Sequence, residues 1–109
     1  MELIRAIPAD ELHRESAAME SKADRDFNEA YRGLIGRIRK EQPDRADFII
    51  QHLRSSQRAW LKYRDAQAGL VGVYHEIGSA SARAAGVTAY SVGLTEARIK
   101  EFKEMPNPF

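Results

Sequence analysis

Residues 27–38 read FNEAYRGLIGRI, and the apolar side chains in this stretch recur every three or four positions. That spacing places them on one face of a helix. Carried back toward the N-terminus, the apolar positions are Leu12, Met19, Ala23, Phe27, Tyr31, Leu34 and Ile38. The segment between Pro8 and Gln42 is therefore expected to form one long amphipathic helix, with a break near Ser21 as the alternative.

Two further helical segments follow Pro43, which is suited to the first turn of a helix. On the second, from about Asp44 to Ile77, one face carries Ile49, Leu53, Trp60, Arg64, Val71 and Tyr74. On the third, one face carries Val87, Ser91, Leu94, Arg98 and Phe102. No alternating run predicts a strand. The expected fold is all-α, a three-helix antiparallel bundle with two long helices and a third packed across them.

The composition fits one globular domain spanning residues 1–109, with its core at about residues 9–103. Of the 109 residues, 43% are apolar and 30% are charged, and the net charge is +1. A charge so near zero does not favour nucleic acid or an anionic membrane as the partner. No cysteine is present, so disulfides and thiolate metal sites are excluded. Neither a signal peptide nor an apolar run of membrane-spanning length is recognised.

Residues typical of catalytic or metal sites do not cluster in the sequence. His13, His52 and His75 lack metal-ligand spacing, and no glycine-rich phosphate loop is present. We therefore expect no catalytic residues, no metal, no cofactor and no enzymatic activity. Gly33 and Gly36 fall inside the first helix, where glycine disfavours helix formation. Their expected use is close approach of another helix or of a partner.

Gln57, Trp60 and Arg64 lie at helical spacing on the second segment. Two arrangements suit Arg64: it covers the indole ring while its guanidinium reaches solvent, or it is buried and paired. Asp65 is not expected to be its partner, because adjacent residues on a helix do not face each other. Asp65 could instead accept a hydrogen bond from Arg98 on the third helix.

Three basic residues, Arg54, Arg58 and Lys62, repeat every four positions on the second segment. Such a stripe could contact phosphates, but an exposed solvated helix face is the commoner explanation at this net charge. Against an anionic protein partner, the same stripe would steer association.

Three segments together resemble the LprI-like family of small bacterial envelope proteins, whose namesake is a lysozyme inhibitor. They are DRDFNEAYRGLIGRI (24–38), LRSSQRAWLKYRDAQA (53–68) and GLTEARIKEF (93–102), within a resemblance covering roughly residues 20–103. The residues that match the family pattern are Asn28, Tyr31, Leu53, Gln57, Trp60, Arg64, Asp65, Leu94, Thr95, Arg98 and Phe102. Family members usually carry paired cysteines. Here Ala68 occupies one of those positions, and Ala89 or Tyr90 lies near the other.

The resemblance implies a periplasmic or secreted helical protein that binds a protein partner, and for some members of the family it implies inhibition of a lysozyme-type peptidoglycan hydrolase. The cytoplasm is the alternative compartment, and the alternative function is a helical adaptor or an immunity protein that binds a secreted toxin. The residues expected to form a structural network between helices are Gln57, Trp60, Arg64, Asp65 and Arg98. The residues expected to contact a protein partner are Tyr74, His75, Glu76 and Ser79, while an ordinary helix connection is the simpler alternative for that loop. Neither the partner nor the oligomeric state follows from the sequence.

Overall fold

The computed structural model describes residues 9–74 and 80–105, and almost all of them are helical. Its elements are α1 (Ala9–Glu41), the short 3-10 helix η1 (Pro43–Arg45), α2 (Ala46–Tyr74) and α3 (Ala80–Glu104). These ranges contain no strand, so the prediction of an all-α, three-helix fold is confirmed. The helix α1 is continuous through Ser21, which removes the alternative of a break there.

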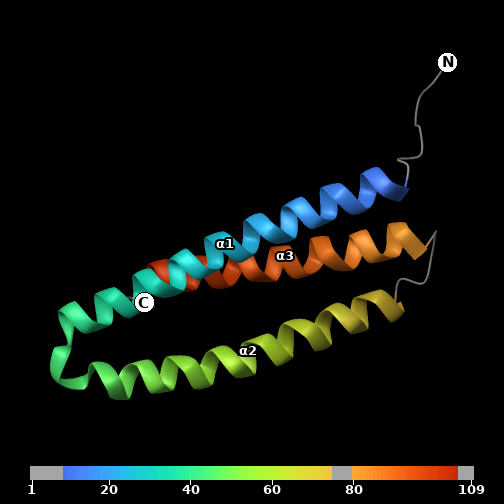
Figure 1. Cartoon of the computed structure of the whole chain (residues 1–109). Helices are drawn as coiled ribbons and strands as arrows, with labels where there is room; N and C mark the ends of the chain where they lie inside the picture. The colour runs from blue at the N-terminus through green and yellow to red at the C-terminus, as the bar shows by residue number, and fades with distance from the viewer. Residues whose placement is uncertain (1–8, 75–79, 106–109) are drawn as a thin grey trace.

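The three helices form an elongated bundle of 64 × 25 × 25 Å (Figure 1). The chain runs along α1, reverses at η1, returns along α2 and then follows α3 in the same direction as α1. The most extensive contact is between α1 and α3, the next joins α2 to α3, and α1 touches α2 least. The third helix therefore lies lengthwise along the other two and holds the bundle together.

Local chemistry explains why the first helix ends where it does. Two basic residues, Arg39 and Lys40, lie in its last turn, where positive charge favours the helix dipole. The amide of Gln42 still donates to the carbonyl of Ile38 at 2.9 Å, but Pro43 has no amide hydrogen with which to continue the ladder. The chain therefore reverses at Pro43, as the sequence predicts.

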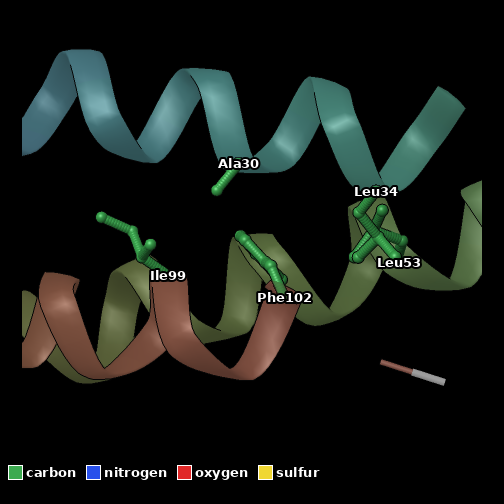
Figure 2. Packing of buried hydrophobic residues seen from close by; sticks show 5 residues of the cluster. All are labelled: Ala30, Leu34, Leu53, Ile99 and Phe102. Atoms are coloured by element: carbon green, nitrogen blue, oxygen red, sulfur yellow. The ribbon is translucent and has the colours of Figure 1, made fainter. Parts of the chain in front are cut away.

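The hydrophobic core lies in the half of the bundle nearest the α1–α2 turn. Figure 2 shows side chains from all three helices meeting there. The buried cluster consists of Ala30, Leu34, Leu53, Ile99 and Phe102, with Phe27, Tyr31, Ile35 and Ile38 packed around it. The periodic stretch 27–38 thus supplies one wall of the core, as its spacing predicts.

The third helix buries more than the one face that its periodicity suggests. Arg98 and Phe102 are buried as expected, but Val92, Thr95 and Ile99 are buried as well. The extra burial follows from the position of α3, because a helix that packs against two neighbours is covered over a wider arc than an outer helix.

Close helix contact occurs at a glycine that the sequence analysis did not single out. A side-chain carbon added at Gly36 would meet nothing within 4 Å, and one at Gly33 would meet only Arg37 of the same helix. The expectation that another helix of this chain approaches these glycines is therefore wrong. At Gly72, in contrast, an added carbon would lie 3.1 Å from the side chain of Val87. The second and third helices approach closely there.

We expect Gly36→Ala to stabilise the protein by about 0.5–1 kcal/mol, because alanine is the better helix former and the added methyl group has open space. The matched variant Gly72→Ala should gain less or lose stability, since Val87 must move aside. Urea unfolding of the two variants checks this difference. A Gly36→Ala protein less stable than the Gly72→Ala protein would contradict it.

Candidate functional site

The most connected polar side chain in the described part of the chain is Arg98 of α3. Its side chain is only 8% exposed. The guanidinium donates three hydrogen bonds: Nε to Oε1 of Gln57 (3.3 Å), Nη1 to Oε2 of Glu101 (3.0 Å) and Nη2 to Oγ of Ser56 (2.9 Å). Two of these acceptors belong to α2. The side chain of Arg98 therefore fixes the position of α2 against α3 through directional bonds.

The indole ring of Trp60 lies beside two guanidinium groups. The Cζ atom of Arg64 is 5.4 Å from the ring centroid, and that of Arg98 is 5.9 Å away. The ring also stacks on Phe27 of α1, with centroids 5.7 Å apart and planes 13° apart. Cation–π attraction of this kind strengthens where water is excluded. The tryptophan thus connects all three helices.

Arg64 combines the two arrangements that the sequence left open. Its side chain covers the indole ring and remains 24% exposed, while Nη1 donates to Oγ1 of Thr95 on α3 at 3.4 Å. Its Nε donates to Oδ1 of the adjacent Asp65 at 3.3 Å. The expectation that Asp65 does not pair with Arg64 is therefore wrong. The arginine side chain is long enough for its Nε to reach the carboxylate of the adjacent residue.

The suggested bond between Asp65 and Arg98 does not form. Arg98 is bonded to Ser56, Gln57 and Glu101, whereas the Asp65 side chain is 72% exposed and contacts Arg64. Four of the five network residues, Gln57, Trp60, Arg64 and Arg98, meet between α2 and α3, and Asp65 lies at their exposed edge. We name these four residues together with Ser56, Thr95 and Glu101 the arginine–tryptophan network.

Sequence reasoning missed part of this network and one further bond. Ser56, Thr95 and Glu101 accept from arginines, although Thr95 does match the family pattern. Arg37 of α1 also donates from Nη2 to the backbone carbonyl of Phe102 at 2.6 Å. Nothing in helical spacing predicts an acceptor 65 residues away.

One polar atom of the network has no partner. Gln57 is 8% exposed, and its Oε1 accepts from Arg98, but its Nε2 has no hydrogen-bond partner among the described residues. Gln57 also lines a pocket of about 290 Å³ between α1 and α2. The residues lining this pocket, called the α1–α2 pocket below, are Phe27, Asn28, Tyr31, Arg54, Gln57, Arg58 and Leu61.

Of the four residues expected to contact a partner, the structure describes Tyr74, which is the last residue of α2 and is 79% exposed. His75, Glu76 and Ser79 fall outside the described residues. Before Tyr74 the helix presents two more exposed apolar side chains, Leu70 at 57% and Val73 at 70%. The run AGLVGVY at 68–74 carried this signal in the sequence, where it is the most apolar part of the second segment.

Neither a metal centre nor a membrane span is found in residues 9–74 and 80–105. No group of three potential ligands from His, Cys, Asp and Glu comes together there, and no helix is long and apolar enough to cross a bilayer. On α1, the side-chain hydrogen bond between Lys22 and Asp26 raises the pKa of the lysine and lowers the pKa of the carboxyl. The two side chains are 72% and 45% exposed, so this pair is a surface contact and not a buried reactive site.

These features define the protein as a small helical bundle held by arginine–aromatic contacts. A family model described as lysozyme inhibitor LprI matches residues 9–102, and the chain therefore belongs to this family. The resemblance seen in the sequence is confirmed and covers nearly all of the described bundle. No curated protein and no solved structure matches the chain.

Proposed function

We propose that this protein is a non-enzymatic binding protein of the bacterial envelope that inhibits a lysozyme-type peptidoglycan hydrolase without a cofactor. The family match over residues 9–102 carries the proposal, because it spans all three helices and not one short motif. A periplasmic or secreted location is part of the proposal, since peptidoglycan and the hydrolases that cleave it lie outside the cytoplasmic membrane.

The arginine–tryptophan network serves this function as a support and not as a contact surface. Gln57 and Arg98 are buried, and Trp60 is half-buried between helices, so none of the three offers a broad face to a partner. A helix held in fixed register presents its exposed side chains in one arrangement, which reduces the ordering that binding must impose. The network therefore pre-organises the outer surface of α2.

The far end of α2 supplies one contact in this proposal. Leu70, Val73 and Tyr74 are exposed there and lead directly into the connection that holds His75, Glu76 and Ser79. Large apolar and aromatic side chains grouped on a surface are typical of protein interfaces. The end of α2 and the following connection would then lie against the surface of the hydrolase.

The test is residual lysozyme activity on a cell-wall suspension, titrated with this protein across several lysozyme types. We expect inhibition of at least one type to saturate near one inhibitor per enzyme, because a specific interface has a single footprint. The same protein unfolded by heat serves as the control and should not inhibit. Full activity of every lysozyme at large inhibitor excess would reject the proposal and favour the adaptor or immunity-protein alternative.

A further inference from the structure

The central part of α2 is basic and contains no acidic residue. From residue 48 to residue 64 the sequence has no aspartate or glutamate, and Asp47 and Asp65 bound this stretch. Within it, Arg54, Arg58 and Lys62 recur every four residues. We call these three residues the basic ridge. They lie along one slanted line on the helix and span about 12 Å along its axis.

The charges of the basic ridge are not neutralised within the described part of the chain. All three side chains are exposed, and none takes part in an ion pair or a hydrogen bond there. Other cations of the bundle, such as Lys22 and Arg98, are paired with carboxylates. A partner could therefore engage the basic ridge without first breaking an internal contact.

The basic ridge borders the α1–α2 pocket. Arg54 and Arg58 form one side of this pocket, whose remaining lining includes the aromatic rings of Phe27 and Tyr31 and the exposed side chain of Leu61. Gln57, with its unpartnered Nε2, also belongs to the lining. Arginines next to aromatic side chains are the combination that protein interfaces favour at their centre.

The same face of α2 continues to the exposed apolar end of the helix. Lys62 and Val73 are eleven residues apart, which is close to three helical turns, so both point to the same side. Between them this face carries the small, exposed side chains of Ala66 and Gly69, with the exposed carboxylate of Asp65 at its edge. The basic ridge and the apolar end thus lie along the same side of α2.

We propose that the basic ridge enters the substrate cleft of the hydrolase and pairs with its catalytic carboxylates. This inference rests on the proposed function and identifies the surface that performs it. Glycoside hydrolases place two carboxyl groups on either side of the bond they cleave, about 5–5.5 Å apart in retaining enzymes. Residues four apart on a helix have their Cβ atoms about 5–6 Å apart, so the long side chains of Arg54 and Arg58 leave the helix close enough together to reach both carboxyl groups.

Pairing of this kind would block the reaction in two ways. The helix would occupy the cleft in place of the polysaccharide. A guanidinium beside the general acid would also lower the pKa of that carboxyl, because an opposite charge favours its ionised form. The general acid must be protonated to act, so the enzyme would lose its proton donor as well as its access to substrate.

The surroundings of the basic ridge favour a protein, and not a nucleic acid, as its binding partner. Phosphate-backbone binding depends on many cations acting together, whereas this ridge has three and is flanked by Asp47 and Asp65. The net charge of the chain is only +1. The apolar and aromatic lining of the adjacent pocket suits a folded protein surface better than a phosphate backbone.

The experiment compares three proteins in the lysozyme titration: the wild type, Arg54→Glu/Arg58→Glu, and the charge-matched control Lys100→Glu/Lys103→Glu on α3. All four positions are exposed, so circular dichroism should show every protein folded. We expect the α2 variant to inhibit about 100-fold more weakly than wild type, and the α3 control to remain within about twofold. A lysozyme whose general-acid glutamate is replaced by glutamine should bind the wild type less tightly and lose most of this discrimination.

The results distinguish two claims: that the protein inhibits a lysozyme, and that the basic ridge is the surface that inhibits it. If the wild type inhibits but the α2 variant inhibits equally well, or both variants are impaired equally, the basic ridge is not the inhibitory surface and the proposed function stands. If the wild type neither binds nor inhibits any lysozyme, both fail together. If duplex DNA binds the wild type at physiological salt and the α2 variant does not bind it, the basic ridge is a phosphate-binding surface and the inference is overturned.

Discussion

Phe102→Ala should destabilise the protein by about 3–5 kcal/mol, the largest effect of any substitution considered for this chain. The side chain of Phe102 is 0% exposed and lies in the core shown in Figure 2. Its ring contacts Phe27 and Tyr31, with centroids 5.5 and 5.7 Å away, and the guanidinium of Arg98 lies 4.8 Å from its centroid. Truncation removes all three contacts and leaves a cavity where three helices meet.

The measurement is urea unfolding followed by circular dichroism at 222 nm. Because a domain of this size is stable by only about 5–15 kcal/mol, the substitution should remove a large share of that stability and lower the urea concentration at the unfolding midpoint. Phe48→Ala is the matched control, since Phe48 is 57% exposed and its loss should change stability by less than about 1 kcal/mol. Equal unfolding midpoints for the two variants would show that the core is not centred on Phe102.

Arg98→Ala should destabilise the protein by about 3 kcal/mol, which is large for a polar residue. The substitution removes three hydrogen bonds and the packing of the guanidinium on Trp60 and Phe102. It also leaves Oε1 of Gln57 buried without a donor, in addition to the Nε2 atom that already has none. An unsatisfied buried polar group is destabilising by itself.

Three comparison variants separate the causes of that loss, each measured by urea unfolding. Arg98→Lys keeps the charge but cannot donate in three directions from a planar group, so it should recover only part of the stability. Arg64→Ala should lose about 1 kcal/mol, because Arg64 is 24% exposed and its bonds are longer, at 3.3 and 3.4 Å. Lys100→Ala, at a side chain 77% exposed, should change almost nothing. A loss at Arg98 no greater than at Lys100 would refute a structural role for the network.

The arginine–tryptophan network also bears on the absence of cysteine. The family resemblance implies that relatives carry a disulfide between α2 and α3, at the position of Ala68 and near that of Ala89 or Tyr90. Such a disulfide would typically add about 2–4 kcal/mol to the free energy of unfolding. In this chain the same two helices are joined by the bonds of Arg98 and by the close contact of Gly72 with Val87. The loss of stability expected for Arg98→Ala is of the same size as the contribution of such a crosslink.

The sequence by itself determined the helices and the turn between the first two of them. The spacing of Phe27, Tyr31, Leu34 and Ile38 is a local property of 3.6 residues per turn, and it gave both the helix and its core-facing side. Pro43 marked the chain reversal because proline lacks an amide hydrogen. The motif around Trp60 also indicated the family, which the match over residues 9–102 confirmed.

Only the tertiary structure decided which side chains meet. Arg98 finds its α2 acceptors 41 and 42 residues earlier in the chain, and Arg37 finds the carbonyl of Phe102 65 residues later. Helical periodicity shows which face a residue occupies on its own helix, but not which neighbour that face meets or at what height. Those depend on how α3 lies along both α1 and α2, and packing of all three helices at once sets that position.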